Sequence, residues 1–161
     1  MSARFLLSAV LALGVAGGAQ AAEKVALPSI KQLDLAAAER IAQAADLYAR
    51  QQGWAGSIAV VDNAGYPIVV RRMDGATAIS ADLAMRKAKA SALFGAPSVN
   101  FENRVNDGHP ALLALDVTTL AGGQPILVDG KVIGAVGVST AVGAHDDPIS
   151  VAGAHALDGA R

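Results

Sequence analysis

The chain has 161 residues, with 13 lysines and arginines against 14 aspartates and glutamates, a formal net charge of −1 and no cysteine. No run of basic residues could follow a phosphate backbone, which argues against a nucleic-acid partner. The absence of cysteine excludes disulfides, thiolate metal sites and a cysteine nucleophile.

The N-terminus has the three parts of a secretory signal. Arg4 precedes an apolar run over residues 5–16, which closes on the small residues Gly17-Gly18-Ala19-Gln20-Ala21. A membrane anchor is the alternative, but about a dozen apolar residues are too few to span a bilayer. We therefore expect residues 1–21 to be a signal peptide and 22–161 a single domain, periplasmic or secreted, with no transmembrane anchor.

The first half of the mature chain predicts a helix and a hairpin. Asp34 is a plausible N-cap for an alanine-rich helix over 35–52, which Gly53 would end. The almost wholly apolar stretch 57–61 predicts a strand buried on both faces. It turns at Asp62-Asn63-Ala64-Gly65 into a second strand over 66–72.

The second half predicts another helix, a polar interval, a hairpin and a last helix. We expect a helix over about 80–94, capped by Ser80 or Asp82, then a turn-rich interval over 97–110. Asp129-Gly130 joins two apolar strands and favours a type I′ turn, because both residues tolerate positive φ. A helix over about 146–157 follows. This order predicts an α+β fold with an antiparallel sheet built from two hairpins.

Four blocks now resemble the GlcG/HbpS-like family, long described only as a domain of unknown function. They are VVDNAGYPIVVRRMDGA, ISADLAMRKAKASALFGAPS, GGQPILVDGKVIGAVGVST and DDPISVAGAHAL, in the order found in that family. The resemblance implies a profilin-like three-layer α/β/α sandwich that forms a homo-oligomer, octamers included. Some relatives are exported haem-binding proteins. Thr140 stands where the family commonly has glycine, so a hydroxyl side chain replaces bare backbone at that edge of the pocket.

Three histidines are candidate ligands of haem iron or of a divalent metal. His109 lies in the polar interval and can reach outward, although a loop histidine is also often simply exposed. His145 is followed by Asp146-Asp147, and histidine beside carboxylates can hold a cation, whereas helix capping explains the aspartates without any ligand. His155 lies in an alanine-rich helical segment, which favours a surface or packing role.

Arginines supply the candidate partners of a carboxylate, because a guanidinium matches the two oxygens with parallel hydrogen bonds. Arg72 and Arg86 are preferred, since each lies in a block that matches the family. A solvated face, or ion pairs with Asp74 and Asp82, is the structural alternative. The glycines at 122–137 do not form a phosphate loop, because they lead into no helix N-terminus and Pro125 lacks an amide hydrogen.

These observations leave two functional hypotheses of different class. In the first, the protein is an exported haem-binding protein for scavenging, buffering or sensing, with Arg72, Arg86 and Thr140 at the pocket and His109 or His145 on iron. In the second, it is an isomerase-type or lyase-type enzyme acting on a small organic acid, with Arg72 or Arg86 on the carboxylate and Asp74 or a histidine moving a proton. An oligomeric accessory protein is a third possibility, and the sequence favours a non-enzymatic role.

Overall fold

A computed structural model describes residues 25–26 and 29–158. The signal peptide predicted over residues 1–21 lies outside the described residues. Within the described part, no helix is both long and apolar enough to cross a membrane.

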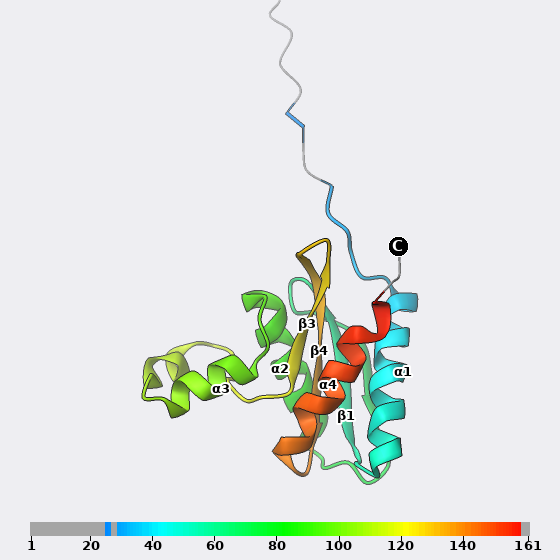
Figure 1. The fold of residues 1–161 in the computed structure, drawn as a ribbon, viewed down its shortest axis with the longest axis vertical. Coiled ribbons are helices and arrows are strands. Elements are labelled where there is room, and N and C mark those ends of the chain that lie inside the picture. Colours follow the sequence, from blue (N-terminus) through cyan, green and yellow to red (C-terminus); the bar gives the residue numbers. More distant parts are fainter. Residues whose placement is uncertain (1–24, 27–28, 159–161) are drawn as a thin grey trace, which may run out of the picture.

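The core of the fold is one antiparallel sheet of four strands. They are β1 (Gly56–Asp62), β2 (Pro67–Arg72), β3 (Gly123–Val128) and β4 (Lys131–Thr140), in the spatial order β2-β1-β4-β3. Each hairpin supplies two neighbouring strands, and the two hairpins join where β1 pairs with β4 (Figure 1). The predicted α+β fold with two hairpins is confirmed.

Turn chemistry sets the second hairpin. Asp129 and Gly130 both have positive φ, 51° and 72°, as the predicted type I′ turn requires. Among the described residues, Asp129 is the one non-glycine with positive φ. The first hairpin turns differently, with a longer loop in which the Asp62 carboxylate accepts hydrogen bonds from the amides of Ala64 and Tyr66.

Helices cover both faces of the sheet and produce the three expected layers. α1 (Leu35–Gln52) and α4 (Asp146–Ala154) lie on one face, and α2 (Ser80–Phe94) lies on the other (Figure 1). On the first face, Ile41 and Ile149 of the helices pack against Ile58 and Val136 of the sheet. Because helices cover β1 from both sides, its strand residues are buried almost throughout, as the apolar run predicts.

The predicted N-cap of α1 is confirmed, whereas the N-cap predicted for α2, Ser80 or Asp82, is wrong although α2 has the predicted bounds. The Asp34 carboxylate accepts the Ala37 amide at 2.8 Å, and Gly53 ends α1 in the left-handed region. At α2, Ile79 occupies the N-cap and no side chain caps the helix. The Ser80 hydroxyl is instead buried, 2.7 Å from both the Thr77 carbonyl and the Ser57 hydroxyl. Burial against the sheet therefore replaces the capping role.

α2 approaches the sheet so closely that two strand glycines, Gly123 and Gly137, have no room for a side chain. A Cβ on Gly137 would lie 2.1 Å from the carbonyl oxygen of Ala84, and one on Gly123 would lie 2.3 Å from that of Lys87. The facing residues, Ala88 of α2 and Ala135 of β4, are also small and buried. The alanine and glycine content of these segments therefore determines the spacing between helix and sheet.

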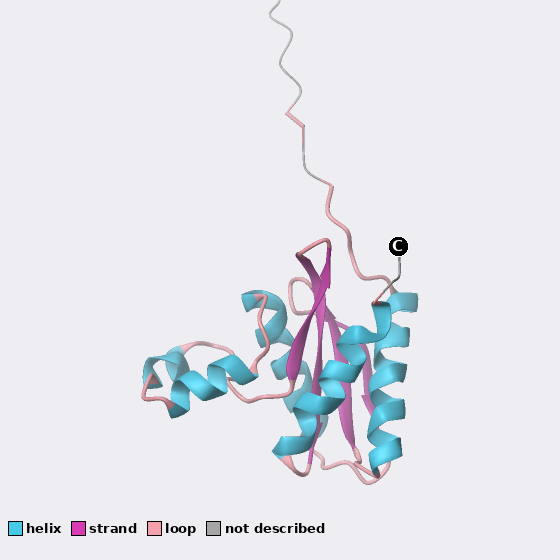
Figure 2. Cartoon of the chain, in the orientation of Figure 1, coloured by secondary structure: helices cyan, strands magenta, loops and turns pink. Residues whose placement is uncertain are grey.

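The interval 97–110 is not the turn-rich loop that the sequence predicts. It contains α3 (Val99–Asn106), which with the 3₁₀ helix η1 (Pro110–Ala114) forms an arm projecting from the body (Figure 2). The strong helix breakers Pro97, Gly108 and Pro110 stand at the ends of α3, and the asparagines inside it are only mildly unfavourable in a helix. Ser98 ties the base of the arm to the sheet by accepting the Gly123 amide and donating to the Leu120 carbonyl, both at 2.8 Å.

We expect the substitution Gly137→Ala to lower the free energy of unfolding by about 1–3 kcal/mol, because the new methyl group would push α2 off the sheet. Gly143→Ala is the matched control, since a Cβ there meets nothing within 4 Å. Urea unfolding followed by circular dichroism measures both. Equal stabilities of the two variants would show that the contact between α2 and the sheet is not tight.

Candidate functional site

The strand register gathers three of the predicted site residues at one end of the sheet. Ser57 pairs with Arg72, and the neighbouring Gly56 pairs with Thr140, so Arg72 and Thr140 flank the start of β1 on its two sides. His145 ends the 3₁₀ helix η2 (Gly143–His145), which follows the end of β4. The end of the sheet where β1 begins is therefore the candidate site.

Two adjoining hollows open at this end. The first is a cavity of about 340 Å³. Its lining combines apolar and charged groups, namely Arg50, Gly53, Trp54, Ala55, Met73 and Asp74. The second, of about 290 Å³, shares Arg50 and Met73 with the first and adds Asp46, Arg71 and Arg72. The first volume lies at the lower end of the range for small-molecule sites, and an apolar wall with a few charged groups is typical of them.

His145 lies face to face with Trp54. The two ring centroids are 3.9 Å apart and the ring planes differ by 5°. The ring of Tyr48 packs edge-on against the indole of Trp54, with a centroid distance of 6.4 Å. Trp54 follows Gly53 directly, so the residue that ends α1 also places this indole beside the cavity. Stacking occupies one face of the imidazole, whereas its ring nitrogens lie at the edge.

Three arginines surround the second hollow, and they differ in their partners. Arg50 donates to the Asp46 carboxylate at 2.8 Å, and this hydrogen bond raises the pKa of the Arg50 guanidinium. Arg71 pairs with Glu39. Arg72 donates to the carbonyl oxygen of Ala76 at 3.3 Å and has no carboxylate partner among the described residues. Of the three, Arg72 is therefore the guanidinium best placed to donate hydrogen bonds to a carboxylate of a ligand.

Thr140 is held by a buried aspartate. Its amide donates to Asp146 Oδ1 at 2.7 Å, and its hydroxyl lies 2.8 Å from the same oxygen. The other carboxylate oxygen of Asp146 contacts the Lys87 ammonium at 2.5 Å. The side chain of Asp146 therefore serves these contacts and does not cap α4, whose N-cap has no side-chain hydrogen bond.

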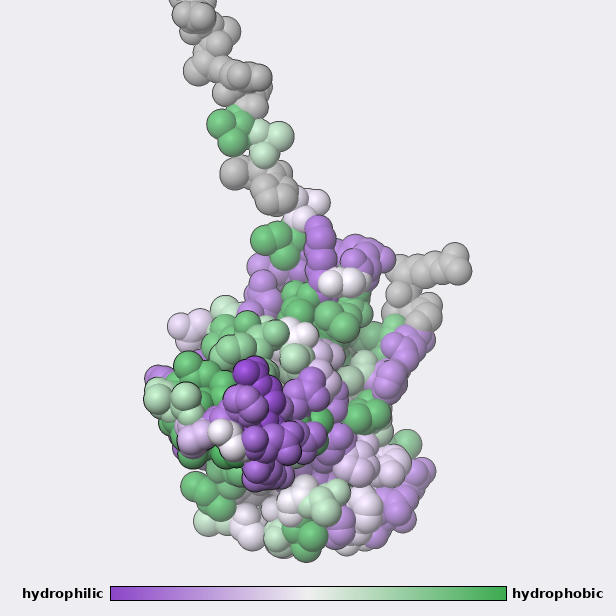
Figure 3. All heavy atoms as spheres, turned by 60° about the vertical axis from the view of Figure 1, so that its left-hand side comes forward, coloured by the Kyte–Doolittle hydropathy of each residue, from purple (hydrophilic) through white to green (hydrophobic). Residues whose placement is uncertain are grey.

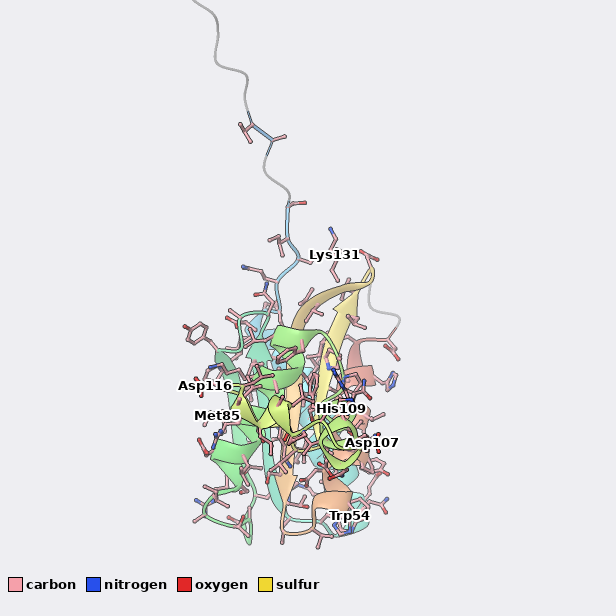
Figure 4. The ribbon with its side chains drawn as sticks, turned by 90° about the vertical axis from the view of Figure 1, so that its left-hand side faces the viewer. Trp54, Met85, Asp107, His109, Asp116 and Lys131 are labelled. Atoms are coloured by element: carbon pink, nitrogen blue, oxygen red, sulfur yellow. The ribbon has the colours of Figure 1, made fainter. Side chains whose placement is uncertain are left out.

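The fold does not bring the other predicted residues to this end. His109 lies on the arm, exposed, with Nδ1 3.2 Å from the Arg104 carbonyl oxygen. Figure 4 shows His109 on the arm, well away from Trp54 at the lower end of the body. Arg86 is exposed on α2 and pairs with Asp82 at 3.8 Å, the ion pair that the sequence offered as an alternative. His155 is exposed and pairs with Asp158.

Sequence reasoning missed Trp54 and Arg50, which line the cavity. A signal for both was present, because a helix that ends at Gly53 directs the residues on either side of it to one end of the body. It also missed the pairing of Lys87 with Asp146, which joins residues 59 positions apart. No local pattern reports such a contact.

The residues of this end suit a haem better than a bare metal ion. Within the described ranges, no group of three or more histidine, cysteine, aspartate or glutamate side chains could hold a metal. In haem the porphyrin supplies the equatorial ligands, so that a single histidine can complete the iron site. The indole of Trp54, the thioether of Met73 and the guanidinium of Arg72 match the flat apolar ring and the carboxylates of a haem.

Comparison with known proteins gives the family. The model of the family described as "Haem degrading protein HbpS-like" matches residues 33–155. Protein GlcG of Escherichia coli strain K12 is 40% identical over 92 residues, which cover 56% of this chain and 69% of GlcG.

Solved structures with a similar fold lead to the same family. A double mutant of HbpS from Streptomyces reticuli is 35% identical, with a TM-score of 0.75 over 85% of this chain and 98% of that chain. The structure of a complex of PduOC with haem is 25% identical, with a TM-score of 0.71 over 80% of this chain and 96% of that chain. Because the family model spans most of the sequence and the same fold recurs in these structures, the chain belongs to the HbpS-like family.

Proposed function

We propose that this protein is an exported haem-binding protein that scavenges, buffers or senses haem. The observation that carries the proposal is the stacking of His145 on Trp54 beside a cavity bordered by arginines. The family description and the haem complex of PduOC support the choice of ligand. Bound haem would supply an iron centre that takes axial ligands and exchanges electrons.

Each residue of the site has a distinct role in this proposal. The edge of the His145 ring offers a nitrogen to iron, and stacking on Trp54 limits the rotation of the ring. Arg72 binds a propionate, because no carboxylate partner of its own competes within the described part of the chain. Trp54 and Met73 would provide apolar surface for the macrocycle, and Thr140 lies beside the start of β1 at the same end of the sheet.

A haemin titration of the purified protein, followed at the Soret band, tests these roles. We expect saturation at a fixed stoichiometry. His145→Ala should change the Soret spectrum and weaken haemin binding by about tenfold or more, because loss of a residue that ligates a metal, or that orients such a residue, has an effect of this size. Arg72→Ala should weaken binding by about threefold to tenfold, because the guanidinium is exposed and its charge is screened.

The matched controls are His109→Ala and Arg86→Ala, which change the same residue types away from the site. Both should bind haemin like the wild type. If His109→Ala alone alters the Soret band, the haem site lies on the arm and not at the end of the sheet. Absorbance that rises without saturation in every variant would remove haem as the ligand.

The enzyme hypothesis uses the same end of the fold. Asp74 lines the cavity beside Arg50, so that a carboxylate able to move a proton stands near cations able to hold a small acid. This second candidate gains weight if haemin does not saturate. A panel of small organic acids, assayed for binding by calorimetry, is then the next measurement.

Self-association is part of the proposal, and the arm supports it. No residue of α3 is buried, and Leu113 of the arm is exposed, as are Leu115 and Leu120 in the segment that follows it. Figure 3 shows apolar side chains gathered beside a polar patch on the face that carries the arm. Exposed apolar side chains gathered on one face often mark an interface.

We expect the purified protein to form a homo-oligomer, octamers included, in light scattering coupled to size exclusion. Leu113→Asp combined with Leu115→Asp should shift the mass to smaller species, because buried carboxylates oppose association. Tyr66→Asp is the control, since Tyr66 is also an exposed hydrophobic residue but lies in the β1–β2 turn. An unchanged mass in the leucine variant would exclude the arm as the interface.

Export is the remaining part of the proposal, and it rests on the sequence of residues 1–21. We expect N-terminal sequencing of the protein recovered from the periplasm or the medium to begin near Ala22. Arg4→Glu, which removes the positive charge before the apolar run, should retain precursor in the cell. Recovery of uncleaved protein in the cytoplasm alone would contradict export.

A further inference from the structure

The loop that carries His145 is closed at its base by one carboxylate. Residues 141–145 run from the end of β4 to the start of α4, and Asp146 is the first residue of that helix. Asp146 Oδ1 accepts the Thr140 amide at 2.7 Å and lies 2.8 Å from the Thr140 hydroxyl. Inside the loop, the His145 amide donates to the Val142 carbonyl at 2.9 Å. The Asp146 carboxylate therefore joins the two ends of the loop.

Lys87 fixes that carboxylate from the other face of the sheet. Its ammonium lies 2.5 Å from Asp146 Oδ2, and the two side chains are only 4% and 2% exposed. Lys87 belongs to α2, whereas Asp146 belongs to α4, and the two helices lie on opposite faces. Gly122 leaves the passage between them open, since a Cβ there would lie 2.6 Å from Asp146 Cβ and 3.3 Å from Lys87 Nζ.

The two oxygens of the Asp146 carboxylate thus have different partners. Oδ1 holds the loop through Thr140, and Oδ2 holds the ammonium of Lys87. If Lys87 were removed, a buried unpaired charge would remain, and the carboxylate would turn toward water to recover its solvation. Such a turn breaks the contacts with Thr140 and releases the loop that seats His145 on Trp54.

We infer that Lys87 and Asp146 are a positioning pair that seats the His145 imidazole on Trp54 and so presents its ring edge to the ligand. This inference rests on the proposed function for the identity of the ligand, but the seating of the ring does not depend on it. Neither side chain lines the cavity beside Trp54, so both act through the loop.

The fluorescence of Trp54 reports directly on its stacking with His145, because Trp54 is the only tryptophan of the chain. A stacked imidazole changes the emission of an indole, so His145→Leu should change the Trp54 fluorescence of the ligand-free protein. In the Lys87→Met background the ring is already displaced, so that adding His145→Leu should change the emission little. This non-additivity is the expected result of a double-mutant cycle on coupled residues.

A purely structural role for the pair gives a different result. Lys87→Met would then lower the midpoint of urea unfolding, while His145→Leu would change the emission equally in both backgrounds, which overturns the inference. Arg86→Met is the control for the helix, since Arg86 is the exposed neighbour of Lys87. If Lys87→Met does not fold, Thr140→Val serves instead, because it removes one contact of Asp146 without leaving a buried charge.

Haemin titration separates this inference from the proposed function. With haem as the ligand, Lys87→Met should shift the Soret band toward that of His145→Ala and weaken binding by about tenfold, the usual effect of losing a residue that orients a ligand. If the wild type does not saturate with haemin, the proposed function fails, and the fluorescence cycle still tests the pair. If the wild type saturates and Lys87→Met changes neither the Soret band nor the Trp54 emission, the inferred role of Lys87 and Asp146 is wrong, whereas the proposed haem binding stands.

Discussion

The ion pair between Lys87 and Asp146 joins the three layers of this fold. It links α2 to α4 across the plane of the sheet, at a point where Gly122 carries no side chain. Charges removed from water in this way are costly unless they are paired and hydrogen-bonded, and losing one partner of a buried pair typically costs about 3–5 kcal/mol. The pair therefore requires α2, α4 and the Gly122 backbone to be placed together, and it makes their arrangement cooperative.

The two faces of the sheet are packed by different means. Toward α1 and α4 the sheet presents branched side chains such as Ile58, Val60 and Val138, which interdigitate with the isoleucines of the helices. Toward α2 it presents Gly137 and Ala135, so that helix and sheet meet almost backbone to backbone. The close approach of α2 is what brings the backbone of Lys87 near enough for its ammonium to reach Asp146. The small residues that face α2 thus make the ion pair between Lys87 and Asp146 possible.

The candidate site depends on that arrangement. The loop with His145 joins β4 to α4, and Trp54 follows Gly53 at the end of α1, so the imidazole and the indole come from segments far apart in the sequence. Arg72 comes from a third segment, since it is the last residue of the edge strand β2. A site composed from several elements in this way is rigid only where the layers are tied together. The tie nearest to it is the pair of Lys87 with Asp146.

The sequence by itself determined the elements whose causes are local. Turn residues at Asp129-Gly130, the cap at Asp34 and the stop at Gly53 act within a few positions of the chain, so the hairpins, α1 and the α+β class could all be predicted. The ordered family blocks extended that prediction to the three layers. His145 was a candidate from its residue type, and Arg72 and Thr140 were candidates from their places in the family blocks. Local patterns failed at α3, whose breakers stand only at its ends, and at Ser80, where burial overrides capping.

Only the tertiary structure decided which candidates meet. It separated His109 and Arg86 from the others, and it added Trp54 and Arg50 to the site. The physical reason is that strand register and layer packing, which act between residues far apart in the sequence, set these distances. Ser57 faces Arg72 and Gly56 faces Thr140 because the hairpins pair in that register, and Lys87 meets Asp146 because α2 rests on glycine. Long-range contacts of this kind leave no periodic or local signal in a single sequence.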